Sequence, residues 1–390
     1  MRLLALALAL CLSAPAAADS QRKRSFRTLD DDELPAVARM QPGPWVDVGE
    51  TPGHLRSMLV PRPAGSENNT IVREYIQSVF SKLGWHTELD TFTGTTPEGT
   101  VEFTNLIFTF DPDASTKFVL AAHHDSKWFA TYPANQFVGA TDSAAPCAML
   151  LDLAEAITPA LKERKTRLAA QRPSTGDSVE DEDGDDDFDE QEAAKTTLQF
   201  IFFDGEEAFH DWTATDSIYG SRHLAAEWES TFLPAEHPYQ PLARRRMDPN
   251  PTVLSTIEHL VLLDLLGAPQ PRIMQWYRET GWLFAEMRDA DARLRESGLV
   301  EGTNKGEWFS PLSFGGSIED DQVPDDATAL DLATMQRWNL ILRVFTLEYL
   351  GLKPTKAAIG REQNDKRTAQ ESSASFQHHE LVSVSKVRWN

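Results

Sequence analysis

Residues 198–212 (LQFIFFDGEEAFHDW) constrain the fold of this 390-residue chain more than any other segment. Residues 198–203 form an apolar run without helical spacing, which is typical of a buried strand in a parallel sheet. The run ends at residues 204–207 (DGEE), and open α/β sheets hold their ligands at the carboxyl ends of such strands. Two adjacent glutamates there are costly to bury unless a cation neutralises one of them. The pattern favours a metal ligand beside a proton-transfer group, and the alternative is a solvated strand end with two incidental acids.

Two further apolar runs end in the same kind of chemistry. Residues 118–125 (FVLAAHHD) end in two histidines and an aspartate, and residues 259–267 (HLVLLDLLG) place Asp264 in a run otherwise free of charge. Between them, residues 139–143 (GATDS) form a turn that leads into an apolar helical pattern. Because buried acids are rare unless they are paired or bind metal, the three strand ends together indicate a metal-dependent hydrolase-like site rather than an ordinary α/β core.

The rest of the chain alternates between strand and helix patterns, as βαβ units do. The expected strands are residues 85–92, 105–110, 118–122, 198–203 and 260–265, and the expected helices are residues 71–83, 144–157, 221–228 and 332–350. This order predicts a three-layer α/β/α sandwich with a mostly parallel central sheet.

Composition sets the limits of the folded part. Residues 1–18 have the apolar core and A-x-A end of a secretory signal, so we expect a secreted protein, with a retained signal anchor as the alternative. We expect one domain over residues 19–352, a disordered acidic insert at 170–196 and a disordered tail at 353–390. The formal charge of −23 argues against nucleic acid and anionic membranes as partners. Asn68 begins a glycosylation sequon, and Cys147 is expected to be a buried core thiol.

Several segments resemble the glutaminyl-peptide cyclotransferases, the single-zinc relatives of the co-catalytic zinc aminopeptidases. The resemblance runs in order from about residue 61 to residue 352, and it rests on the segments HHDSKWF, FVGATDSAAPCAMLLDLAEA, LQFIFFDGEEAF, DSIYGSRHLA, VLLDLLGAP, GGSIEDDQVP and ILRVFTLEYLGL. It implies a zinc aminopeptidase-like fold, Zn²⁺ as cofactor and peptides or proteins with an N-terminal glutamine as substrates. A monomer without a membrane span is expected.

The resemblance also implies roles for individual residues. Asp142 and Glu207 correspond to zinc ligands, and Glu206 corresponds to the general acid/base. Asp264 and Asp320 correspond to the acidic residues that share the glutamate's proton. Trp212 and Lys127 correspond to substrate-binding residues.

The chain departs from the family pattern directly after Pro324. Relatives continue there through a buried strand and a loop that carries the third zinc ligand, a histidine, whereas here Asp325 and Asp326 follow at once. On the order of two dozen residues are therefore missing, enough for a strand and a loop. None of the ten histidines matches the missing ligand. Since catalytic zinc needs three protein ligands, we expect either a splicing or gene-model error or an impaired enzyme, and favour the first.

Two other functions remain open. The two-metal aminopeptidases use a strand-end histidine and two aspartates, which His123, Asp142 and Asp264 match independently of the gap. A secreted zinc aminopeptidase is therefore the second enzymatic hypothesis. The third is a catalytically inactive binding homologue that keeps the pocket.

Overall fold

The main sheet of the computed structural model contains five strands in the order β1-β2-β4-β3-β5. The model describes residues 27–30, 32–40, 53–170, 190–275, 277–300, 306–310 and 325–355. The five strands are β1 (His86–Thr96), β2 (Gly99–Thr109), β3 (Thr116–His123), β4 (Thr196–Phe203) and β5 (Ile257–Leu262). A separate pair joins β6 (Ile273–Met274) to β7 (Phe309–Ser310). Each strand expected from the sequence is present, with shifted ends.

The pairing of the strands is mixed, so the expectation of a mostly parallel sheet holds for only part of it. Strands β4, β3 and β5 are parallel, whereas β1 pairs antiparallel with β2, and β2 pairs antiparallel with β4. The two-residue connection between β1 and β2 closes a hairpin and cannot cross over as a parallel connection must, which makes this pair antiparallel. The parallel part places the carboxyl ends of β3 and β4 side by side, with His123 opposite Phe203.

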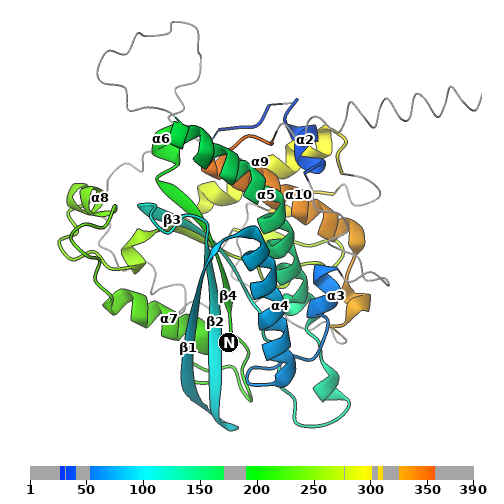
Figure 1. Cartoon of the computed structure of the whole chain (residues 1–390). Coiled ribbons are helices and arrows are strands. Elements are labelled where there is room, and N and C mark those ends of the chain that lie inside the picture. The colour runs from blue at the N-terminus through cyan, green and yellow to red at the C-terminus, as the bar shows by residue number, and fades with distance from the viewer. Residues whose placement is uncertain are drawn as a thin grey trace, which may run out of the picture.

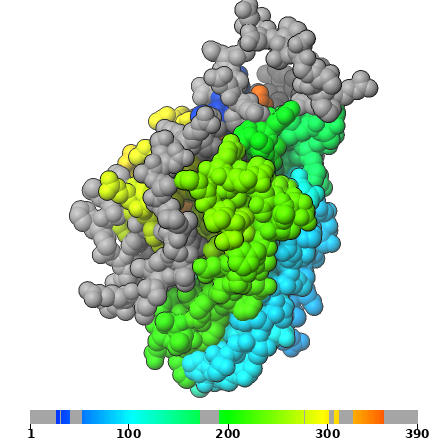
Figure 2. All heavy atoms as spheres, turned by 90° about the vertical axis from the view of Figure 1, so that its left-hand side faces the viewer, coloured from blue at the N-terminus to red at the C-terminus, as the bar shows by residue number. Residues whose placement is uncertain are grey.

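Helices cover both faces of the sheet and complete the three layers (Figure 1). On one face, Phe118, Phe200 and Phe202 pack in the main core with α4 (Glu67–Leu83), α5 (Ala145–Ala170) and α10 (Leu332–Leu350). On the other face, Val119 and Ile201 pack with α7 (Tyr219–Ser230). Figure 2 looks onto this second layer, where the green segment after β4 lies beside the cyan β1–β2 hairpin. Burial of both faces explains why β3 and β4 are apolar throughout instead of alternating.

The remaining helices are short or peripheral: α2 (Leu34–Ala38), α3 (His54–Met58), α6 (Glu190–Ala193), α8 (Gln240–Arg245) and α9 (Gly281–Glu296). The helical stretch Ala134–Ala170, which includes α5, has the length and hydropathy of a membrane span, but 89% of its apolar window is buried in the protein. Helix α5 is therefore the central core helix of the fold.

The structure changes the boundaries of two expected features. Residues 190–196 form α6 and the first residue of β4, where the acidic insert was expected to continue. Glu190 forms an ion pair there with Arg167 near the end of α5. Strand β5 ends at Leu262, so Asp264 lies in the loop beyond the strand and not inside it.

Some expectations fall outside the described residues. These are the signal at 1–18, residues 171–189 of the insert, Asp320, and the tail beyond residue 355. They stay predictions from the sequence.

Candidate active site

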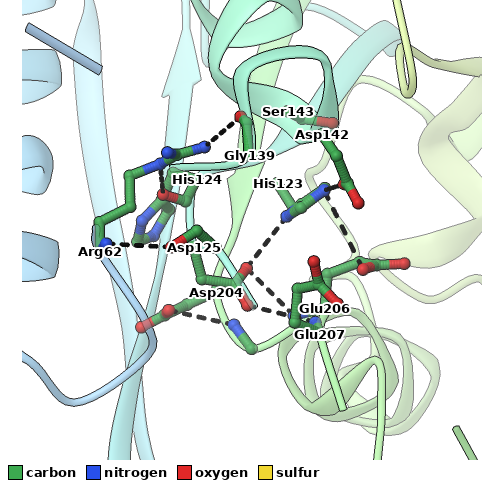
Figure 3. A network of polar contacts seen from close by, with 12 residues as sticks. Arg62, His123, His124, Asp125, Gly139, Asp142, Ser143, Asp204, Glu206 and Glu207 are labelled. Atoms are coloured by element: carbon green, nitrogen blue, oxygen red, sulfur yellow. Dashed lines mark hydrogen bonds and ion pairs between the residues drawn. The ribbon is translucent and has the colours of Figure 1, made fainter. Parts of the chain in front are cut away.

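Polar side chains from three strand ends and one helical turn meet at the carboxyl edge of β3, β4 and β5 (Figure 3). The imidazole of His123 lies at the centre. Its Nε2 is 2.7 Å from Oδ1 of Asp142, 3.5 Å from Oδ1 of Asp264 and 4.0 Å from Oε2 of Glu206. The structure therefore brings together four of the residues that the sequence singled out, although Asp264 and His123 are 141 positions apart in the chain.

Asp125 connects the end of β3 to the two glutamates. Its Oδ1 accepts a hydrogen bond from the main-chain N–H of Glu206, and its Oδ2 accepts one from the N–H of Glu207, both at 3.2 Å. The same carboxylate lies 3.2 Å from Nδ1 of His123. Asp125 thus orients both the imidazole and the loop after β4. The sequence pointed to this residue only as one of several polar groups at the strand end.

Asp142 is carried by the helical turn Ala140–Ala144, which follows Gly139. Gly139 has φ +53°, and a Cβ atom there would lie 2.0 Å from the carbonyl oxygen of Asp142. Only glycine fits this close approach, so the glycine of the GATDS segment is needed to place the aspartate.

Asp264 is held by the neighbouring residue of the same turn. The hydroxyl of Ser143 donates a hydrogen bond to Oδ1 of Asp264 at 2.5 Å, and the N–H of Leu265 donates to the same oxygen at 3.0 Å. Half-buried at the rim of the site, Asp264 faces His123. The structure therefore places Asp264 beside the turn that carries Asp142.

The electrostatics of the site favour proton binding at the two glutamates. Burial raises the pKa of Glu206 well above its usual value, and the carboxylates of Asp264 and Asp142 raise it further, against the opposing effect of His123. Burial, followed by the charges of Asp142 and Glu206, likewise raises the pKa of Glu207. Perturbed carboxyl groups in a cluster of this kind are typical of functional sites.

The pKa of the His123 imidazole is also raised, but against the effect of burial. Burial alone would lower its pKa, but the charge of Glu206 and hydrogen bonds to surrounding aspartates outweigh burial and raise the pKa well above its ordinary value. The protonated ring therefore partly compensates the negative charge of the cluster.

The residues fit a divalent metal ion. The ligand atoms of His123, Asp142 and Asp264 all lie within 4.8 Å of one another. In addition, Oε1 of Glu207 is buried and has no hydrogen-bond partner among the residues that the structure describes, which is costly for a carboxylate oxygen unless a cation binds it. One imidazole and several carboxylates form a donor set that suits zinc.

The two expected substrate-binding residues lie on the loops that follow β3 and β4. Nζ of Lys127 is 3.8 Å from Oε2 of Glu207, so this side chain lies beside the expected metal ligand. The indole of Trp212 is 38% exposed. Asn68 lies in the first turn of α4, where its side-chain amide donates to the carbonyl of Pro61 at 2.8 Å. The binding roles and the glycosylation of Asn68 stay predictions.

Sequence reasoning missed the residue that organises the loop after Glu207. Asp216 accepts hydrogen bonds from the N–H groups of Phe209, His210 and Asp211 and from the hydroxyl of Tyr219. No local pattern distinguishes Asp216 from a surface acid, because its partners come together only when the loop closes.

A second group of potential ligands lies away from this site. Asp90 on β1 faces His223 and Glu227 on α7, with Nδ1 of His223 at 3.1 Å from Asp90 and 4.0 Å from Glu227. The amide of Asn105 also donates to Asp90 at 2.7 Å. Ordinary hydrogen bonding accounts for this arrangement, which ties α7 to the edge of the sheet.

The fold and the acid-rich strand ends define a class of α/β peptidase-like proteins, and residues 105–298 match the model of Peptidase family M28. The chain is 37% identical to the glutaminyl-peptide cyclotransferase of Bos taurus, over 76% of this chain and 81% of the relative. It is 33% identical to that of Drosophila melanogaster, over 76% and 80%. The crystal structure of Macrostomum lignano glutaminyl cyclase is similar at a TM-score of 0.65 and 32% identity, covering 85% of this chain and 96% of that one. The chain therefore belongs to the glutaminyl-peptide cyclotransferase family, as its sequence motifs indicated.

Proposed function

We propose that this protein is a zinc-dependent glutaminyl-peptide cyclotransferase that converts the N-terminal glutamine of peptides and proteins to pyroglutamate and releases ammonia. The observation that carries the proposal is the paired arrangement of Glu206 and Glu207. Their main-chain N–H groups both donate hydrogen bonds to the carboxylate of Asp125. Oε1 of Glu207, which has no hydrogen-bond partner among the described residues, is buried beside the group of potential ligands.

The two glutamates have different roles in the proposed reaction. Glu207 and Asp142 would hold the zinc ion, which supplies a Lewis acid for the γ-carboxamide of the substrate. Glu206 takes a proton from the α-amine, whose nitrogen attacks the carbonyl carbon of the γ-carboxamide and forms the new C–N bond of the lactam. When the bond to the amide nitrogen breaks, Glu206 returns the proton and ammonia leaves. A raised pKa at Glu206 suits this exchange of one proton.

The other acids of the cluster keep the proton available. Asp264 raises the pKa of Glu206 through its charge, and Asp320 is proposed to join it by resemblance. Trp212 and Lys127 are proposed to contact the substrate. The α-amine and the γ-carboxamide belong to the same glutamine residue. The site therefore has only to hold these two groups in the reactive geometry for the ring to close.

A zinc aminopeptidase is the second candidate function. The convergence of His123, Asp142 and Asp264 within 4.8 Å favours it, since this set does not need a ligand from the segment absent after Pro324. A metal held by these three residues would supply a Lewis acid for hydrolysis of the N-terminal peptide bond. An inactive binding protein is the third candidate.

The test compares the chain as it stands with a variant that restores the missing segment of a relative between Pro324 and Asp325. Each protein is assayed for zinc content, ammonia release from an N-terminal Gln-peptide, and hydrolysis of Leu-anilide, with metal-free controls. We expect weak zinc binding and weak cyclisation in the original chain and recovery of both in the restored one. Near-stoichiometric zinc with full cyclisation in the original chain would show that the ligand assignment is wrong.

Further properties belong to the same proposal. We propose that the protein enters the secretory pathway through residues 1–18, acts as a monomer, and carries residues 171–189 as a solvated insert. Sizing of the secreted protein and N-terminal sequencing test these points directly.

A further inference from the structure

The turn that carries Asp142 is held from two sides by residues far away in the chain. Residues 138–142 connect the loop after β3 to α5. Arg62, which precedes α4, contacts the first half of this segment, and Asp325, which precedes α10, contacts the second half. Figure 3 shows Arg62 on one side of Gly139 and Asp142 on the other.

Arg62 is fully buried, and its guanidinium donates only to main-chain carbonyls. Two of these carbonyls belong to the segment 138–142: Nη1 donates to Val138 and Nη2 donates to Gly139 at 3.3 Å. Nε donates to His124 at 2.9 Å, and Nη1 also reaches Met58 at 3.0 Å. Within the described part of the chain, no carboxylate forms an ion pair with it. Burying a cation without a carboxylate partner costs stability, which indicates that the hydrogen bonds of Arg62 to these carbonyls have a role in the fold.

Asp325 supplies the opposite polarity. It is 2% exposed, and its carboxylate accepts hydrogen bonds from the N–H of Thr141 at 2.9 Å and the N–H of Asp142 at 3.2 Å. The hydroxyl of Thr141 donates to the same carboxylate at 3.0 Å, and the main-chain carbonyl of Asp325 accepts from Ala140 at 3.1 Å. Three consecutive N–H groups of the turn therefore end on one residue.

We propose that Arg62 and Asp325 are positioning residues that together fix Asp142 for metal binding, an arrangement we call the loop clamp. Arg62 binds the carbonyl groups of residues 138–139, and Asp325 binds the N–H groups of residues 140–142. Together they fix the orientation of the peptide groups in this segment. The inference rests on the proposed function insofar as Asp142 is a metal ligand. Residues that orient metal ligands commonly change metal affinity by roughly 10–100-fold when they are lost.

The test uses two variants of the clamp and two matched controls. Asp325→Asn keeps the shape but replaces an acceptor oxygen by a donor, and Arg62→Lys keeps the charge but reaches fewer carbonyls. Asp326→Asn changes the neighbouring acid, whose side chain accepts hydrogen bonds from the N–H and the hydroxyl of Thr328. Arg343→Lys changes another buried arginine, which pairs with Asp152 away from the site.

Two quantities are measured for each protein. The first is amide hydrogen exchange of residues 140–142 in the metal-free chain, and the second is the zinc dissociation constant by chelator competition. We expect Asp325→Asn and Arg62→Lys to speed exchange of the Thr141 and Asp142 amides by at least about tenfold and to weaken zinc by roughly 10–100-fold. The controls should leave both unchanged, even where Arg343→Lys lowers the melting temperature.

The two readouts separate the clamp from the proposed function. Exchange at residues 140–142 that does not change in Asp325→Asn would overturn the clamp, and so would faster exchange without any loss of zinc affinity in a chain that binds zinc. The unmodified chain could bind no zinc while Asp325→Asn still speeds amide exchange at residues 140–142. That result would support the structural role of the clamp and contradict the proposed zinc-dependent function. If Arg62→Lys does not fold, Asp325→Asn decides alone.

Discussion

Glu206 and Glu207 are adjacent in the sequence, yet their substitution should have opposite consequences. We consider Glu206→Gln and Glu207→Gln, which change charge but hardly change volume. The carboxylate of Glu206 is the proposed proton carrier, so Glu206→Gln should lower the cyclisation rate by roughly 10²–10⁴-fold while zinc binding stays nearly the same. Glu207→Gln removes an anionic ligand and should weaken zinc by more than the ~10–100-fold typical of a residue that only orients a ligand.

The metal-free protein gives the second half of the prediction. In the described part of the chain, Oε1 of Glu207 is buried without a hydrogen-bond partner, and burial, followed by the charges of Asp142 and Glu206, raises the pKa of this carboxyl and opposes its ionisation. An unsatisfied buried group costs about 1–3 kcal/mol, and more when it is charged. Replacing it with a neutral amide should therefore stabilise the metal-free chain, raising its melting temperature by on the order of 2–10 °C.

The assay combines zinc titration, ammonia release from a Gln-peptide and calorimetric melting with and without zinc. Zinc added well above its dissociation constant for the unmodified protein should raise the melting temperature of that protein and of Glu206→Gln, but hardly that of Glu207→Gln. Equal zinc loss in both variants would refute the division of roles. A lower melting temperature for metal-free Glu207→Gln would refute the argument from the unsatisfied oxygen.

Three further predictions concern the loop, the core and the insert. Burial alone would raise the pKa of Asp216, but hydrogen bonds from His210, Tyr219 and the neighbouring N–H groups lower this pKa. The Asp216 carboxylate therefore stabilises the fold above its unfolded-state pKa, and this stabilisation is lost as pH falls through its folded-state pKa. Asp216→Asn should cost about 1–3 kcal/mol at pH 7, and the difference in melting temperature should shrink below about pH 4. Phe202→Ala removes a fully buried ring of the main core and should cost about 3–5 kcal/mol in denaturant titrations, whereas Phe232→Ala at a 66% exposed position should stay within about 0.5 kcal/mol. Deleting residues 177–189, which leaves the ion pair of Glu190 intact, should shift the melting temperature by less than about 4 °C, on the order of 1 kcal/mol, and a larger fall would mean that the insert packs on the domain.

The sequence predicted the strands and the acids at their ends because both depend on local signals. An apolar run followed by DGEE or HHD is visible over about ten residues, and parallel strands bring such ends to one edge of the sheet. The antiparallel pairing of β1 with β2 was not expected, because isolated strand patterns carry no information on direction. Asp264 was placed in a strand for a related reason, since the apolar run continues beyond the last paired residue.

The residues that hold the site together were harder to find than the residues that form it. Asp325 is 184 positions from Thr141, and Arg62 is 77 positions from Gly139. A lone arginine between two prolines and an acid in an Asp-Asp pair look like surface residues in the sequence. Their partners are main-chain groups, which every residue possesses, so no sequence pattern records the contact.

Cys147 has a practical consequence for experiments on this protein. Its thiol is buried in the core and donates to the carbonyl of His123 at 3.1 Å, and burial raises its pKa to about 12. A protonated thiol without solvent access reacts slowly with maleimides and other alkylating reagents. Among the described residues it is the one free cysteine. A single cysteine introduced on the surface of the folded domain can therefore carry a fluorophore or spin label while the native thiol stays in place.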